Sequence, residues 1–141
     1  MTKLVCLDCG QINRVPDAQL GAGPKCGTCG ATLLSGKAQE VDAGTLEKAI
    51  RVDDLPLVVD FWAPWCGPCR MMGPEFSKAA GMLKGQVRLV KLNTEAHQSA
   101  AASYRIRGIP TIISFRRGQE AGRQSGALRA QGIADFATGR G

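Results

Sequence analysis

Three pairs of cysteines, each with two residues between its members, are the part of this sequence best suited to chemistry. CLDC and CGTC lie near the N-terminus, and WCGPC lies near the middle of the chain. A pair at this spacing either exchanges with a disulfide or supplies two thiolates to a metal ion. The first question is whether the six cysteines serve one purpose or two.

The WCGPC cysteines, Cys66 and Cys69, follow an apolar run and precede a helical pattern. The run LVVDFW is typical of a strand buried on both faces. Cys66 is therefore expected at a helix N-terminus, where free N–H groups and a partial positive charge favour the thiolate and lower its pKa. Cys69, one turn later, can attack a mixed disulfide formed at Cys66. Half a metal site or two buried thiols are alternatives, but the strand–helix context favours redox chemistry.

The other four cysteines have the spacing C-x2-C-x16-C-x2-C, formed by Cys6, Cys9, Cys26 and Cys29. This spacing matches a four-thiolate zinc site, and the glycine after each pair permits a tight backbone turn. Four thiolates complete a tetrahedral shell, so one structural zinc that supplies folding energy is predicted. Iron held by four sulfurs and two disulfides are the alternatives.

The elements that must position these cysteines divide the chain into two units. Residues 1–34 contain little apolar sequence and need a metal or disulfides to fold, whereas residues 35–141 show regular patterns. The second unit alternates strands and helices, which predicts an α/β fold with a mixed sheet and helices on both faces. Its expected elements are a helix starting at 42–45, a strand at 55–62, a helix at 66–83, a strand at 87–93, a helix at 95–106, a strand at 111–115, a poor polar strand at 120–125 and a helix at 128–137.

The composition limits the function classes. The formal charge is +6, but the basic residues are dispersed and few aromatics accompany them, so nucleic-acid binding is not expected. No apolar run is long enough to span a bilayer, and the N-terminus shows no secretory signal pattern, so we expect a cytoplasmic protein without a membrane partner. Neither GxGxxG nor a P-loop occurs, so no bound organic cofactor is expected.

Several motifs together resemble the thioredoxin family. They are VVDFWAPWCGPC, the proline at 74, KLN at 91–93 and RGIPT at 107–111, and the resemblance covers about residues 41–138. With the N-terminal CLDCGQINRVPD and KCGTCG, the whole chain resembles the zinc-carrying bacterial branch of this family, thioredoxin-2. The resemblance implies a thioredoxin fold preceded by a small zinc-ribbon-like domain, and a protein-disulfide reductase activity.

The resemblance also implies residue roles. Cys66 would be the nucleophile and Cys69 the resolving cysteine. Asp60, in the middle of the apolar strand, would be a buried carboxylate with a raised pKa that accepts the Cys69 proton. A helix cap or a structural ion pair is the alternative for Asp60. Lys91 would be its charged neighbour, and Pro110 would follow a cis peptide bond.

A shallow surface for an extended substrate segment is implied beside these residues. Its members would be Trp65, Gly67, Pro68, Ile109 and Gly126. Core packing is the alternative for Trp65, but Trp62 is the better core candidate because it ends the predicted strand. The implied partners are protein disulfides and an NADPH-dependent thioredoxin reductase, and we expect a monomer.

Two other functions compete with the reductase. A disulfide oxidase or isomerase could use the same fold, although Gly-Pro between the cysteines resembles the reductants. A zinc-ribbon interaction module could use the second unit only as a scaffold. In addition, oxidation of zinc-bound thiolates would release the metal, so the N-terminal unit could be redox-responsive.

Overall fold

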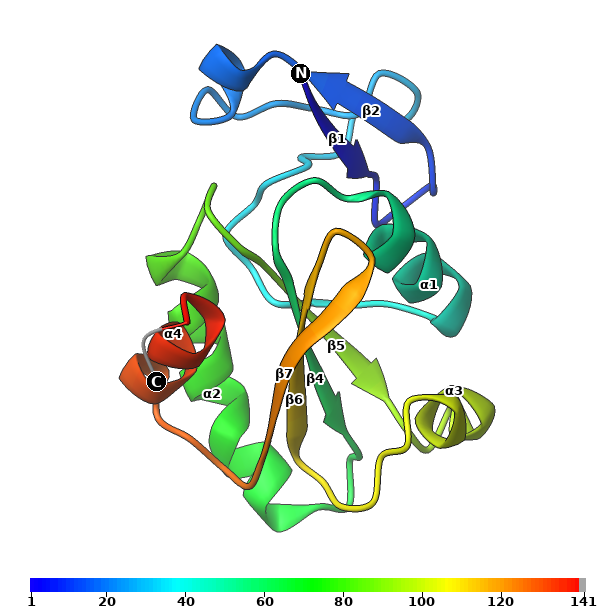
Figure 1. Ribbon diagram of the computed structural model, residues 1–141, viewed down its shortest axis with the longest axis vertical. Coiled ribbons are helices and arrows are strands. Elements are labelled where there is room, and N and C mark those ends of the chain that lie inside the picture. Colours follow the sequence, from blue (N-terminus) through cyan, green and yellow to red (C-terminus); the bar gives the residue numbers. More distant parts are fainter. Residues whose placement is uncertain (140–141) are drawn as a thin grey trace.

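The computed structural model describes residues 1–139 and contains two sheets. A two-stranded hairpin lies near the N-terminus, and a five-stranded sheet forms the centre of the molecule (Figure 1). The elements, in chain order, are β1 (Thr2–Val5), β2 (Ile12–Val15), the 3-10 helix η1 (Asp17–Gln19), β3 (Gln39–Glu40), α1 (Ala43–Val52), β4 (Leu57–Trp62), α2 (Gly67–Met82), β5 (Arg88–Asn93), α3 (Gln98–Ser103), β6 (Thr111–Arg116), β7 (Gln119–Ser125) and α4 (Ala130–Ala137).

The five-stranded sheet has the order β3-β5-β4-β6-β7 and is mixed. β3 and β4 run parallel to β5, whereas β6 runs antiparallel to β4 and β7 antiparallel to β6. β4 is the central strand, and the apolar run that predicted it is buried on both faces because helices cover both. This architecture confirms the predicted thioredoxin fold with a mixed sheet.

Alternate residues of β4 serve two cores. Val58 packs with Met72 and Phe76 of α2 and with Ile133 of α4 on one face. Val59, one residue later, packs on the opposite face with α1, with α3 and with the segment that follows α3. The period of two along a strand thus places a helix pair on each side of the sheet.

The structure contains strands that the sequence pattern did not predict. β3 lies in a segment for which no element is predicted, and it consists of only two residues that pair with β5. The β1–β2 hairpin was not predicted. β7 confirms the polar strand predicted at 120–125: it spans seven residues and is largely exposed. A polar sequence suits it because β7 is an edge strand with little side-chain burial.

The N-terminal unit lies at the end of the molecule where β4 and β5 begin (Figure 1). A buried ion pair connects the two units: the Arg88 guanidinium meets Asp53 at 2.6 Å and also donates to the Leu33 carbonyl at 3.0 Å. The backbone N–H of Val5 donates to the other Asp53 oxygen at 2.8 Å. The unit boundary predicted between residues 34 and 35 stays a prediction.

Within residues 1–139, no helix has the length and apolar character that crossing a membrane requires.

Candidate active site and metal centre

The first turn of α2 presents the WCGPC cysteines. Cys66 is the N-cap residue, and its Sγ accepts a hydrogen bond from the Cys69 N–H at 3.2 Å. Gly67 and Pro68 form the first helical turn, where the missing N–H of proline leaves no bond unmade. Cys66 and Cys69 are joined by a disulfide, with Cα atoms 5.2 Å apart. Both cysteines are at least 95% buried.

The loop before β6 lies against this disulfide. The Ile109–Pro110 peptide bond is cis, the geometry that the sequence resemblance implied. The Ile109 carbonyl oxygen lies 3.7 Å from Cys66 Sγ. The Pro110 carbonyl accepts from the Gly126 N–H at 2.9 Å, which ties the end of β7 to the same place. Of the predicted substrate surface, Ile109 and Gly126 thus lie beside the disulfide or beside Pro110.

The two tryptophans differ from each other in exposure. Trp65 has 67% of its surface exposed, and its indole N–H donates to Glu95 at 2.9 Å. Trp62 was expected in the core, but it is only partly buried. Its indole N–H reaches the Glu40 carboxylate at 3.0 Å, and the Lys91 amine lies 4.4 Å from its ring centroid. Trp62 is the last residue of β4, so its side chain lies at the end of the sheet and not in its middle.

Asp60 is a fully buried carboxyl group in the middle of β4. Among the described residues, neither of its oxygens has a hydrogen-bond partner. Burial raises the pKa of Asp60 to about 7; the positive charge of Lys91 opposes this rise, and the negative charge of Glu40 adds to it. Lys91 is the register partner of Asp60 on β5. An acid with this pKa exchanges its proton near neutral pH.

Glu40 is the residue near the site that sequence reasoning missed. It lies on β3, and it contacts Trp62 while its charge acts on Asp60. No motif includes it, and a two-residue strand has no detectable periodicity.

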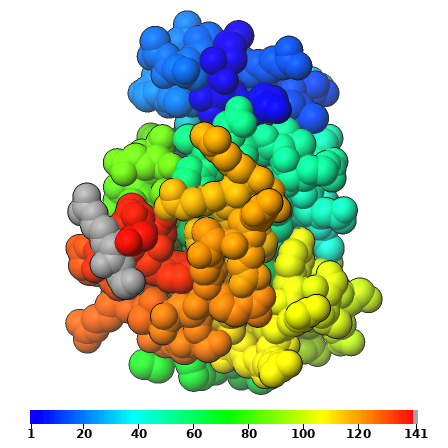
Figure 2. Space-filling model, in the orientation of Figure 1, coloured from blue at the N-terminus to red at the C-terminus, as the bar shows by residue number. Residues whose placement is uncertain are grey.

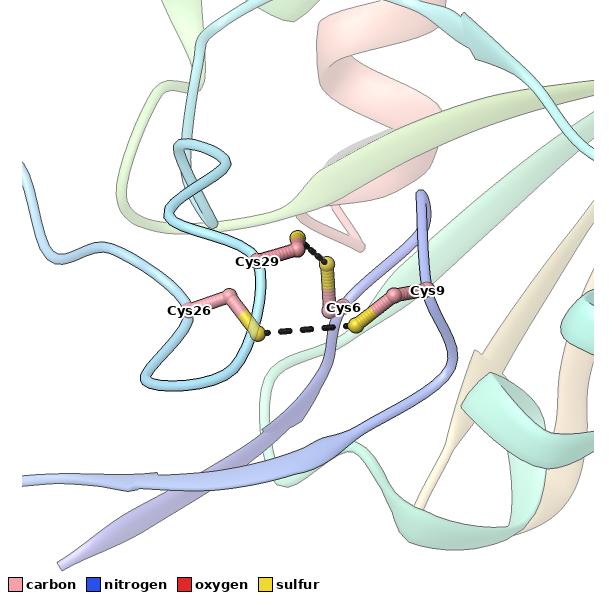
Figure 3. Close-up of side chains that lie close together, drawn as sticks. All are labelled: Cys6, Cys9, Cys26 and Cys29. Carbon is pink, nitrogen blue, oxygen red and sulfur yellow. Dashed lines mark hydrogen bonds between the residues drawn. The ribbon is translucent and has the colours of Figure 1, made fainter.

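The four N-terminal cysteines form a compact cluster of sulfurs (Figure 3). All four Sγ atoms lie within 4.8 Å of one another, and the Cys6–Cys29 and Cys9–Cys26 pairs are each separated by 3.6 Å. The edge of a tetrahedron with metal–sulfur bonds of about 2.3 Å is about 3.8 Å. A disulfide needs about 2.05 Å. The donor set therefore fits a metal and not two disulfides.

Each cysteine pair of the cluster sits on a tight turn. Gly10 and Gly30 have φ values of +82° and +78°, and their N–H groups donate to the carbonyls of Cys6 and Cys26. Only glycine adopts this left-handed conformation at little cost. The Thr28 N–H points at Cys26 Sγ at 3.4 Å, which favours the thiolate form of that sulfur.

Two contacts that the sequence did not indicate hold the first turn against the second unit. Lys48 of α1 donates to the Gly10 carbonyl, and Gln39 of β3 donates to Asp8 at 2.8 Å. The Lys48 ammonium thus contacts the residue that follows Cys9, a ligand of a cluster that would be negative with four thiolates and one divalent ion.

Comparisons with known proteins agree with both sites. The thioredoxin family model matches residues 37–139, and the zinc-ribbon model described as "Thioredoxin 2, N-terminal" matches residues 5–31. Thioredoxin C-3 of Corynebacterium nephridii is 40% identical over 126 residues, covering 89% of this chain and 86% of that relative. Thioredoxin 1 of a Nostoc species is 41% identical over 95 residues, covering 67% of this chain and 88% of the relative.

Solved structures support the same assignment. The crystal structure of chloroplastic thioredoxin z superposes with a TM-score of 0.67 at 32% identity, covering 74% of this chain and 94% of that one. The fold, the disulfide at the start of α2 and the four-cysteine cluster accompany these matches. The chain therefore belongs to the thioredoxin family of thiol–disulfide oxidoreductases, in the branch with an N-terminal zinc ribbon.

Proposed function

We propose that this chain reduces protein disulfides, and the observation that supports this most directly is the placement of Cys66. Its Sγ caps α2, so the helix end stabilises the thiolate that attacks. The Cys66 thiolate attacks one sulfur of the substrate disulfide, forms a mixed disulfide and expels the other substrate sulfur as a thiolate. The Cys69 thiolate then attacks Cys66 Sγ, and the second substrate thiolate leaves. The substrate gains two electrons, and the chain ends with the Cys66–Cys69 disulfide.

Asp60 is the proposed acceptor of the Cys69 proton. A carboxylate with a pKa near 7 and no hydrogen-bond partner among the described residues is a stronger base than an exposed one. Lys91 tunes Asp60, because its positive charge limits how far burial raises the carboxyl pKa.

The substrate segment is proposed to bind beside Pro110 in an extended conformation. Trp65, Gly67, Pro68, Ile109 and Gly126 form the proposed surface. The large exposed area of the Trp65 side chain supports this role, since an unburied aromatic ring beside a reactive disulfide offers apolar contact. The Ile109 backbone is close enough to Cys66 to align a substrate cysteine with it.

The metal of the N-terminal cluster is proposed to be one zinc ion held by Cys6, Cys9, Cys26 and Cys29. The sulfur separations and the zinc-ribbon match support zinc over the disulfide alternative. Its contribution would be folding energy, because four thiolates leave no open coordination position. The cluster is not proposed to take part in disulfide exchange.

The zinc cluster is also proposed to respond to oxidant. Cys9 and Cys29 are exposed, whereas Cys6 and Cys26 are buried, so peroxide would reach one ligand of each pair. The test is to treat the reduced, zinc-loaded chain with peroxide and follow released zinc with a chromogenic chelator. Zinc that remains bound while Cys66 and Cys69 oxidise fully would refute this response.

The remaining proposals concern partners and compartment. An NADPH-dependent thioredoxin reductase is the proposed electron source, and the chain is proposed to act as a monomer. We place it in the cytosol, because four free cysteines kept as metal ligands suit a compartment where thiols stay reduced.

Insulin disulfide reduction, with zinc quantified in the same sample, tests the function. Dithiothreitol is the electron donor, and a Cys66→Ser/Cys69→Ser variant is the matched control. Turnover that disappears in the variant, with one zinc per chain in both proteins, is the expected result. Zinc without turnover in the natural sequence would favour an interaction module instead. Rapid rescue of a scrambled disulfide protein with little net reduction would favour an isomerase.

A further inference from the structure

The basic residues are dispersed along the chain, but acidic residues are scarce in one stretch, so most of the net positive charge falls there. Residues 96–134 contain six arginines and a single glutamate, a net charge of five out of the six that the whole chain carries. They are Arg105, Arg107, Arg116, Arg117, Arg123, Arg129 and Glu120. This stretch also contains the Ile109–Pro110 loop beside the redox disulfide, so its charge bears on what approaches the reactive sulfurs.

Three of these arginines line one open hollow beside the redox site. Arg105 and Arg107 come from the segment between α3 and β6, and Arg123 comes from β7. Thr111, which follows Pro110, and Ser125, which precedes Gly126, also line the hollow. Figure 2 shows the surfaces of α3 and β7 side by side on one face of the molecule. The hollow therefore begins where the proposed substrate surface ends.

Arg123 fixes the backbone that lines this hollow. Its guanidinium makes two bonds to Glu120, at 2.8 and 2.9 Å, so its charge is neutralised locally. The same group donates to the carbonyls of Tyr104 and Arg105, at 3.0 and 3.2 Å. These bonds hold the turn after α3, where Arg105 has a φ of +56°. A left-handed conformation is unfavourable for a residue with a side chain, so it persists only where its surroundings fix it.

Arg105 and Arg107 supply the positive charges of the hollow that are available to a ligand. Both are exposed, and neither has a carboxylate partner within ion-pair distance among residues 1–139. Glu120 lies in the field of Arg105, but Arg123 occupies both of its oxygens. Three arginines and one glutamate leave the hollow with two net positive charges.

We propose that this hollow binds an acidic segment of the substrate, close in sequence to the cysteine that is reduced. Arg107 is two residues from Ile109, a backbone span of at most about 7 Å. A substrate that pairs its cysteine with Cys66 beside Ile109 would thus bring residues a few positions away over Arg105 and Arg107. This inference rests on the proposed reductase function and adds the substrate's charge to it.

The expected effect is kinetic and depends on salt. Charges at the edge of an interface mainly change the association rate and are screened at high ionic strength. An exposed ion pair contributes about 0.2–1 kcal/mol, which is up to about a fivefold change in rate for each arginine.

The experiment uses two disulfide-linked peptides that differ only in their flanking residues, glutamate in one and glutamine in the other. The prereduced full-length chain is mixed with each peptide, and its second-order oxidation rate is followed by tryptophan fluorescence at low and high salt. We expect the acidic peptide to react about three to ten times faster at low salt, with the ratio approaching one at high salt.

Two variants separate the hollow from overall charge. Arg105→Gln/Arg107→Gln is expected to remove the preference for the acidic peptide and to leave the neutral peptide's rate unchanged. Arg14→Gln/Lys25→Gln, exposed positions on the distant N-terminal unit, loses the same charge and is expected to keep the preference.

Four results would overturn the inference. Equal rates with both peptides would refute it and leave the reductase function standing, whereas no reaction with either peptide would refute both. A preference that survives in Arg105→Gln/Arg107→Gln would place the selectivity elsewhere. The last result is that single-stranded DNA slows the reaction while the acidic peptide reacts no faster than the neutral one. That result would assign the hollow to nucleic acid.

Discussion

Replacing Asp60 with asparagine is expected to stabilise the folded chain at neutral and alkaline pH. The carboxyl group is fully buried, neither oxygen has a hydrogen-bond partner among residues 1–139, and its pKa is raised from 3.8 to about 7. Between these two pH values the folded chain keeps a proton that the unfolded chain has released. Stability therefore falls as pH rises from about 4 to 7, and the loss is complete above 7.

The size of this loss follows from the two pKa values of Asp60. At about 1.36 kcal/mol per pH unit, the interval from 3.8 to about 7 corresponds to about 4 kcal/mol. Asparagine has nearly the same shape and does not ionise, so Asp60→Asn removes the pH-dependent loss. The variant is expected to resemble the natural sequence near pH 4 and to exceed its unfolding free energy by up to about 4 kcal/mol at pH 8.

Urea denaturation of the oxidised chain at several pH values from 4 to 8.5 measures this difference. Asp135→Asn is the matched control, because Asp135 lies on the surface of α4, where it accepts from Gln131 of the same helix. The control is expected to follow the natural sequence at every pH. Parallel stability curves for Asp60→Asn and the natural sequence would show that Asp60 does not titrate near neutral pH, and the base role proposed for it would lose its physical ground.

The same Asp60→Asn variant is expected to reduce insulin more slowly, by a factor on the order of ten to a hundred, in assays at neutral pH. Lys91→Gln is expected to raise the pKa of Asp60 further, because the charge that favours the carboxylate is lost; the midpoint of the stability profile then moves to higher pH. Arg88→Met is expected to lower the unfolding free energy by about 3–5 kcal/mol in urea titrations, since it leaves the Asp53 carboxylate buried without its cation. Cys29→Ser is expected to reduce bound metal well below one ion per chain and to lower the melting temperature, while insulin turnover persists.

The redox site could be predicted from sequence because its signals are local. The continuous apolar run of β4, the CxxC motif and the helical period that follows fix Cys66 at a helix N-terminus without any distant contact. The four-cysteine cluster was predictable for the same reason, as its spacing and its glycines determine the two turns. The burial of Asp60 was also predictable, because this carboxylate lies inside a continuous apolar strand.

The contacts between the two units could not be predicted, because they join residues far apart in sequence. Asp53 and Arg88 are 35 residues apart, and the sequence around each gives no sign that both are buried. The Leu33 carbonyl and the Val5 N–H that complete the pair are backbone groups without any side-chain signature. Glu40 was missed similarly, because a two-residue strand is determined by pairing with β5 and not by its own pattern.

The position of the Asp53–Arg88 pair indicates how the metal relates to the redox chemistry. The pair lies where β4 and β5 begin, whereas Cys66 follows the opposite end of β4, so the sheet separates the two sites (Figure 1). The core between α1, α3 and the sheet takes only Val5 and Leu7 from the described residues before residue 34. Loss of the metal should therefore loosen the N-terminal unit and expose the buried pair, and leave the arrangement around Cys66 in place. Any effect of the metal on disulfide exchange is therefore expected to come from a change in stability.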